Sequence, residues 1–181
     1  MVYLFLADGF EEIEALYVLD VLRRAKIDIK TVGVLGKTAT GSHGIPVICD
    51  VAIDEIEPDD TLDMVILPGG LPGAYNLDNS KGVSEFISYA NENSKFICAI
   101  CAAPFILGKR GLLNGKNATC FPGFEKELTG AKVVDCGCVR DGNIITGRAM
   151  GSAHEFALEI LKALTDEETA NLMKKSILLN T

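Results

Sequence analysis

The chain has 181 residues, of which 48% are apolar and 23% charged, and its formal net charge at pH 7 is −8. This length suits one domain with one core, so we expect residues 1–181 to form a single domain. The acidic balance argues against nucleic-acid and membrane partners, because such a surface repels phosphates. The N-terminal apolar run, 2–7, is too short for a signal peptide or a membrane span, which predicts a cytoplasmic protein.

Apolar strands alternate with amphipathic helices along the whole chain. Residues 2–7 have no polar alternation, which is typical of a strand buried on both faces, and apolar residues then recur at helical spacing as far as Ala25. We expect further strands near 29–34, 64–67 and 96–100, a short strand pair or an edge strand over 47–53, a hairpin around 139–144, and helices near 82–91, 152–164 and 166–178. The alternation predicts an α/β fold, a flavodoxin-like three-layer sandwich with a mostly parallel central sheet.

Cys101 stands where a strand is expected to turn into a helix. The apolar segment 96–100 precedes it, and Ala102, Ala103 and Pro104 follow. This order is typical of a nucleophile elbow, in which small residues allow a sharp turn. A helix N-terminus stabilises a thiolate, the reactive form of cysteine. The alternative is a buried structural cysteine, which is equally compatible with the pattern.

Two glycines follow the expected strand 64–67. Gly69 and Gly70 come directly after Pro68, and such a run is commonly a plain turn. Without side chains, the two glycines also let backbone N–H groups approach a substrate. The amides of Gly70 and Ala102 are candidates for an oxyanion hole, because both residues are expected at the carboxyl edge of the sheet.

Glu14 and the two histidines are further candidates. Glu14 lies on the first expected helix, and the functional interpretation is that it turns inward toward Cys101 and stays protonated by desolvation. The alternative is a solvated surface glutamate. His43 and His154 are the only histidines, and each is more typical of a structural or exposed residue. His43 is the better candidate because it lies in a glycine-rich loop.

The six cysteines do not form a metal-binding pattern. Cys98-x-x-Cys101 has the spacing of one zinc-ligand pair, but Cys136-x-Cys138 does not repeat it, and both histidines are distant in sequence. A cytoplasmic location also argues against a disulfide framework. We therefore predict no metal site.

Several motifs in the same order resemble the ThiJ/PfpI superfamily, and within it the DJ-one branch: LADGFEEIEA, DVLRRA, VILPGG, ICAICAAP and GSAHEFAL. The resemblance covers nearly the whole chain. It implies a flavodoxin-like homodimer without a metal or organic cofactor. By motif position, it implies that Cys101 is the reactive cysteine and Glu14 its protonated partner, with the Gly70 and Ala102 amides beside the sulfur. It also places Arg24 near the dimer contact and the pocket.

The chain departs from its relatives at three positions. Ala102 stands where the protease-like branch has a histidine, which argues against a peptidase. Phe121 replaces a histidine that some DJ-one-like members carry before the proline. His43 falls where relatives have an arginine in the pocket loop. A general base at this site is therefore in question unless His43 substitutes for it.

The resemblance implies cysteine-dependent chemistry on methylglyoxal, glyoxal or their adducts, of the glyoxalase III or deglycase type, in stress protection. The alternative is a redox sensor or chaperone in which Cys101 is oxidised. A glutaminase-like amidotransferase is a third hypothesis, but it needs a cysteine–histidine–acid triad for which the sequence offers no strong histidine.

Overall fold

Seven strands form one sheet in the computed structural model, which describes residues 1–179. Their spatial order is β10–β11–β7–β6–β1–β2–β5, and every neighbouring pair is parallel except β10 and β11. The strands are β1 (Val2–Leu6), β2 (Ile29–Gly33), β5 (Val51–Ala52), β6 (Met64–Leu67), β7 (Phe96–Ile100), β10 (Cys138–Asp141) and β11 (Ile144–Gly147). All residues of β1 and β6 are buried, as their unbroken apolar sequences predict.

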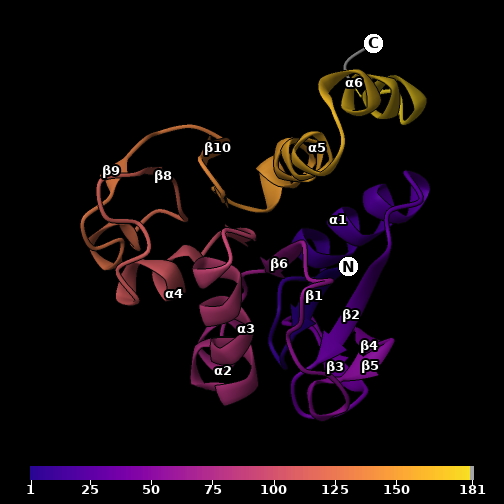
Figure 1. Cartoon of the computed structure of the whole chain (residues 1–181), viewed down its shortest axis with the longest axis vertical. Coiled ribbons are helices and arrows are strands. Elements are labelled where there is room, and N and C mark those ends of the chain that lie inside the picture. Colours follow the sequence, from indigo (N-terminus) through magenta and orange to yellow (C-terminus); the bar gives the residue numbers. More distant parts are fainter. Residues whose placement is uncertain (180–181) are drawn as a thin grey trace.

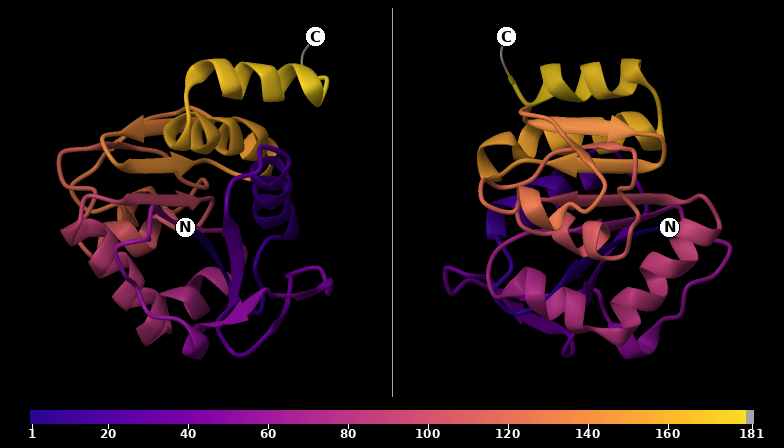
Figure 2. Two further views of the ribbon diagram at one scale, coloured as in Figure 1. Left: turned by 45° about the vertical axis from the view of Figure 1, so that its right-hand side comes forward. Right: turned by 90° about the vertical axis from the view of Figure 1, so that its left-hand side faces the viewer.

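Helices cover both faces of this sheet (Figures 1 and 2). One face packs against α1 (Glu12–Arg24) and α5 (Ala153–Leu164), and α6 (Glu167–Ser176) packs on the outer side of α5. The other packs against α2 (Gly73–Asn79), α3 (Lys81–Glu92) and α4 (Pro104–Lys109). Each face has its own hydrophobic core, so the three-layer sandwich expected from the sequence is confirmed.

Two small two-stranded sheets and several 3-10 turns lie outside the seven-stranded sheet. A hairpin pairs β3 (Thr38–Thr40) with β4 (Pro46–Ile48), and a second small ladder pairs β8 (Asn117–Ala118) with β9 (Lys132–Val133). Three 3-10 turns lie at Ile53–Glu55, Glu125–Glu127 and Met150–Ser152. Helix α2 was not predicted from the sequence, and it begins at Pro72 and Gly73, residue types typical of turns. Among the described residues, no helix is long and apolar enough to cross a membrane.

The strand order brings three loops to one edge. Strands β1, β6 and β7 are adjacent and parallel, so the segments that follow them, 7–11, 68–72 and 101–103, meet at their carboxyl ends. Ligands of open parallel sheets bind at this edge. It contains Glu14 on α1, the Gly69–Gly70 turn and Cys101.

Candidate active site

Cys101 forms a strained turn at the end of β7. Its φ is +65°, a left-handed conformation that non-glycine residues rarely adopt. Its N–H donates to the Gly147 carbonyl (3.0 Å), and its carbonyl accepts from the Phe121 N–H (2.8 Å). Both backbone groups are therefore held by neighbouring segments, and Ala102 and Ala103 are buried behind the turn. This geometry is that of the nucleophile elbow that the sequence predicts.

Glu14 lies beside Cys101, on the α1 side of the sheet. Its side chain is buried, with the residue only 1% exposed, and its Oε2 accepts from the Gly69 N–H at 2.9 Å. Oε1 is also buried and has no hydrogen-bond partner at ordinary distance. An added Cβ at Gly69 would lie 2.6 Å from the Cys101 Cβ and 2.7 Å from Glu14 Oε2. Gly69 thus lets the thiol, the carboxyl and the turn approach one another.

Burial raises the pKa of Glu14 to about 7, although the Cys101 thiol and the Gly69 amide lower it in part. The carboxyl therefore carries its proton for a substantial fraction of the time at neutral pH. The role of a protonated partner, which the family resemblance implies for Glu14, stays a prediction. Glu14 and Cys101 influence each other's pKa even though no normal hydrogen bond satisfies Oε1.

Burial and the facing Glu14 carboxylate raise the pKa of Cys101 to about 12, whereas the amides of Gly70 and Ala102 lower it. The net direction is opposite to the lowering expected from a helix N-terminus, because desolvation outweighs the short α4. The two groups titrate as a pair, and the pair holds one proton between these two pKa values. A Cys101 thiolate near neutral pH therefore requires that Glu14 hold that proton.

The two predicted oxyanion amides lie at the sulfur. The backbone N–H groups of Gly70 and Ala102 lie close enough to the Cys101 side chain to lower the pKa of its thiol. Gly70 has a φ of +84°, and a Cβ there would collide with the Gly9 carbonyl and the Glu11 amide. Only glycine fits this turn, which explains the Pro-Gly-Gly sequence better than a generic loop does.

His43 pairs with Glu12 and not with Cys101. Its N–H donates to Glu12 Oε1 and its Nδ1 lies 2.8 Å from Oε2, while the imidazole is 69% exposed. Burial alone would raise the pKa of Glu12, but the hydrogen bonds from His43 bring it down to about 2. The same Glu12 contact raises the pKa of His43. These His43–Glu12 hydrogen bonds thus connect the loop of the β3–β4 hairpin to α1.

The sequence interpretation missed the role of Glu12. Ligand atoms of Glu11, Glu12 and His43 lie within 4.8 Å of one another, and Glu11 is close enough to raise the pKa of Glu14. The run of glutamates in α1 was visible in the sequence. The sequence did not show that Glu12 pairs with a histidine and that Glu14 lies beside a thiol, because both partners come from distant segments.

Arg24 does not lie beside Cys101 within this chain. It is ten residues beyond Glu14 on α1, about 15 Å along the helix axis. Its side chain is 58% exposed, and its Nε lies 2.6 Å from Asp20. A role at a dimer contact stays a prediction. In His154, at the start of α5, Nε2 lies 3.8 Å from Oε1 of the adjacent Glu155.

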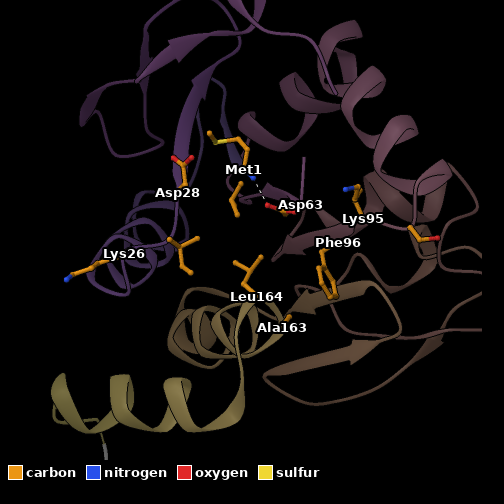
Figure 3. Close-up of a pocket in the computed structure, with 11 residues that line it drawn as sticks. Met1, Lys26, Asp28, Asp63, Lys95, Phe96, Ala163 and Leu164 are labelled. Atoms are coloured by element: carbon orange, nitrogen blue, oxygen red, sulfur yellow. Dashed lines mark hydrogen bonds and ion pairs between the residues drawn. The ribbon is translucent and has the colours of Figure 1, made fainter. Parts of the chain in front are cut away.

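A pocket of about 460 Å³ lies at the opposite edge of the sheet (Figure 3). It is lined by residues that precede or begin β1, β2, β6 and β7, together with the end of α5. Met1 and Asp63 form an ion pair in it, and Phe96 and Leu164 supply apolar surface. Because these are the amino ends of the strands, this pocket is separate from the Cys101 site.

Fold and site together define a class of protein: an α/β sandwich with a cysteine at a strained strand-to-helix turn and a buried carboxyl beside it. The chain belongs to the DJ-1/PfpI family, whose family model matches residues 1–163. The resemblance seen in the motifs is thereby confirmed.

Relatives and solved structures match over almost the whole chain. Protein dj-1beta of Drosophila melanogaster is 36% identical over 176 residues, covering 96% of this chain and 94% of the relative. A deglycase of Pyrococcus abyssi is 32% identical over 160 residues, covering 87% of this chain and 95% of the relative. The crystal structure of Drosophila DJ-1beta superposes with a TM-score of 0.93 at 34% identity, covering 99% and 98%. The structure of oxidized Toxoplasma gondii DJ-1 superposes with a TM-score of 0.94 at 30% identity, covering 99% of this chain and 98% of that chain.

Proposed function

We propose that this protein converts methylglyoxal or glyoxal, or their early adducts, in stress protection, using Cys101 and Glu14 and no cofactor. The observation that carries the proposal is the pairing of a thiol at a strained turn with a buried carboxyl whose pKa is raised to about 7. Deglycases among the relatives support the same class of substrate.

The geometry suits an aldehyde substrate. With Glu14 protonated, the Cys101 thiolate attacks the aldehyde carbon and forms a hemithioacetal, whose oxygen takes up a proton. The amides of Gly70 and Ala102 stabilise negative charge at this point. Glu14, which is ionised because it gave its proton to the hemithioacetal oxygen, removes the proton from the former aldehyde carbon to give an enediolate and returns it to the neighbouring carbon. The hydroxyl proton moves to the neighbouring oxygen, so the product of this step is a 2-hydroxy thioester. Water then hydrolyses the thioester, which releases lactate from methylglyoxal and regenerates the thiol.

Lactate formation from methylglyoxal tests this proposal. We expect Cys101→Ser to reduce it to the level of a protein-free control. Glu14→Gln should lower it by about 10²-fold or more, because a positioned proton carrier is lost. His43→Asn should retain most activity, since the imidazole pairs with Glu12. Full activity in Cys101→Ser would exclude the proposal.

Redox sensing is the alternative, because the same two amides and Glu14 could hold an oxidised Cys101. It would be favoured if wild-type protein forms no lactate but a peroxide converts Cys101 to a sulfinate. An amidotransferase has less support, because the structure pairs neither histidine with Cys101.

We further propose that the chain is a homodimer. Ile13 on α1 is 49% exposed and Ile48 on β4 is 83% exposed, and the His43–Glu12 contact joins these two elements. Exposed apolar residues on adjoining elements suit a self-complementary interface. We expect light scattering to give twice the 19.4 kDa of one chain. Ile48→Lys should shift the mass toward one chain, whereas Leu172→Lys on α6 should not; a monomeric wild type would contradict the proposal.

A further inference from the structure

We propose that Cys136 and Cys138 form a second redox centre, which closes into a reversible disulfide when a peroxide oxidises the protein. This inference does not depend on the proposed function. The two residues lie in the segment that leads into β10, separated by Gly137 alone.

The backbone brings the two thiols together. Residues 136 and 137 form a bend just before β10, so the chain is not extended between the cysteines. The Cys136 thiol donates to the carbonyl oxygen of Cys138 at 3.3 Å, so the Cys136 sulfur lies against the backbone of Cys138. The two thiols are also close enough for Cys136 to raise the pKa of Cys138. A disulfide requires Cα atoms about 4.4–6.8 Å apart, a range within reach of two residues that a single glycine separates at a bend.

The glycine between the two cysteines lies against the end of an acidic side chain. A Cβ at Gly137 would collide with the carboxyl group of Glu155 on α5. The bend therefore packs directly on an acidic side chain. Burial and Glu155 raise the pKa of Cys136, and burial and Glu159 raise that of Cys138. Acidic surroundings disfavour two thiolates, whereas a disulfide carries no charge; a dithiol of this kind holds its disulfide firmly once formed.

The oxidation is balanced with hydrogen peroxide as the oxidant. Cys136, which is less enclosed by the core than Cys138, attacks one peroxide oxygen through its ionised fraction, which the raised pKa keeps small at neutral pH. The O–O bond breaks, Cys136 becomes a sulfenic acid, and one water leaves. Cys138 then attacks the Cys136 sulfur, the S–O bond breaks, and a second water leaves. Two thiols and one peroxide thus give one disulfide and two waters, and a thiol reductant reverses the reaction.

The pair lies next to the Cys101 turn. The Gly137 carbonyl accepts from the Arg148 N–H (2.9 Å), and the adjacent Gly147 carbonyl accepts from the Cys101 N–H (3.0 Å). The Cys136 carbonyl is held by the Thr119 hydroxyl (3.1 Å). The bend is therefore anchored on both sides.

Mass spectrometry of the whole chain tests the inference, because trypsin releases both cysteines on one peptide, 133–140, with no other cysteine. We treat the protein with hydrogen peroxide, block free thiols with iodoacetamide and digest it. We expect this peptide to be unalkylated and lighter by two hydrogens, and to accept two alkyl groups after dithiothreitol. Peptide 117–126, which carries the single Cys120, is the internal control and should stay a free thiol.

Single variants separate the pair from independent oxidation. In Cys138→Ser, the Cys136 sulfenic acid has no partner and should be trapped by dimedone in far higher yield than in wild type. The inference is overturned if peptide 133–140 remains doubly alkylated once Cys101 is fully oxidised. It is also overturned if either cysteine of wild type ends as a sulfinic acid without the two-hydrogen loss. The wild-type measurement decides even if a variant fails to fold.

Discussion

Glu14→Gln should make the protein more stable relative to wild type as the pH rises from 5 to 8. The pKa of Glu14 is raised from 4.5 to about 7 in the folded state, mainly by burial. A raised carboxyl pKa means that the folded state holds its proton longer than the unfolded chain does. Its contribution to stability is complete below about pH 4.5 and is lost as the pH approaches 7. The full shift corresponds to about 3 kcal/mol, and glutamine does not titrate.

Urea unfolding of both proteins at pH 5 and pH 8 measures this effect as a change in the difference between their unfolding free energies. Glu12→Gln is the matched control, two residues away on the same helix and equally buried. The pKa of Glu12 is lowered to about 2, so its contribution is present above about pH 4.5 and falls only in acid. Glu12→Gln should therefore destabilise modestly, because His43 is exposed, and less at pH 8 than at pH 5, because Glu12 raises the pKa of His43 and the protonated imidazole is lost over this range. A pH-independent difference for Glu14→Gln would show that its carboxyl is ionised throughout.

Gly69→Ala should damage both stability and activity. The new Cβ would lie 2.6 Å from the Cys101 Cβ, 2.7 Å from Glu14 Oε2 and 3.0 Å from the Ile100 carbonyl. Two of these three atoms are backbone or directly attached to it, so they cannot swing away. Overpacking of this kind costs about 1–3 kcal/mol. The turn must shift relative to Glu14, and a misplacement near 1 Å can reduce turnover about 10²-fold.

Gly151→Ala is the control for this change. No atom lies within 4 Å of a Cβ at Gly151, and its φ is not in the left-handed region, although it lies in the Met150–Ser152 turn near the site. We expect wild-type stability and turnover from it. Unfolding free energies and lactate formation for the two variants are measured together. If Gly69→Ala matched Gly151→Ala in both assays, the close approach at Gly69 would have no functional importance.

Patterns local in sequence were sufficient for the layers of the fold. The apolar runs of β1, β6 and β7 have no alternation because both their faces are covered, and this property is readable without a structure. The elbow at Cys101 was predictable for the same reason, since strand, cysteine and small residues are consecutive. Helix α2 was not, because Pro72 and Gly73 are turn residues whose helical continuation is supported by packing of Ala74 and Leu77 into the core.

The sequence by itself determined which residue types reach the carboxyl edge of the sheet; the tertiary structure decided which charge each of them carries. Glu12 and Glu14 are the same residue type on one helix. Glu12 meets His43, 31 residues away, and is held ionised. Glu14 meets the Gly69 amide, 55 residues away, beside a buried thiol, and tends to stay neutral. Protonation depends on desolvation and on partners from distant segments, and neither is encoded in local spacing.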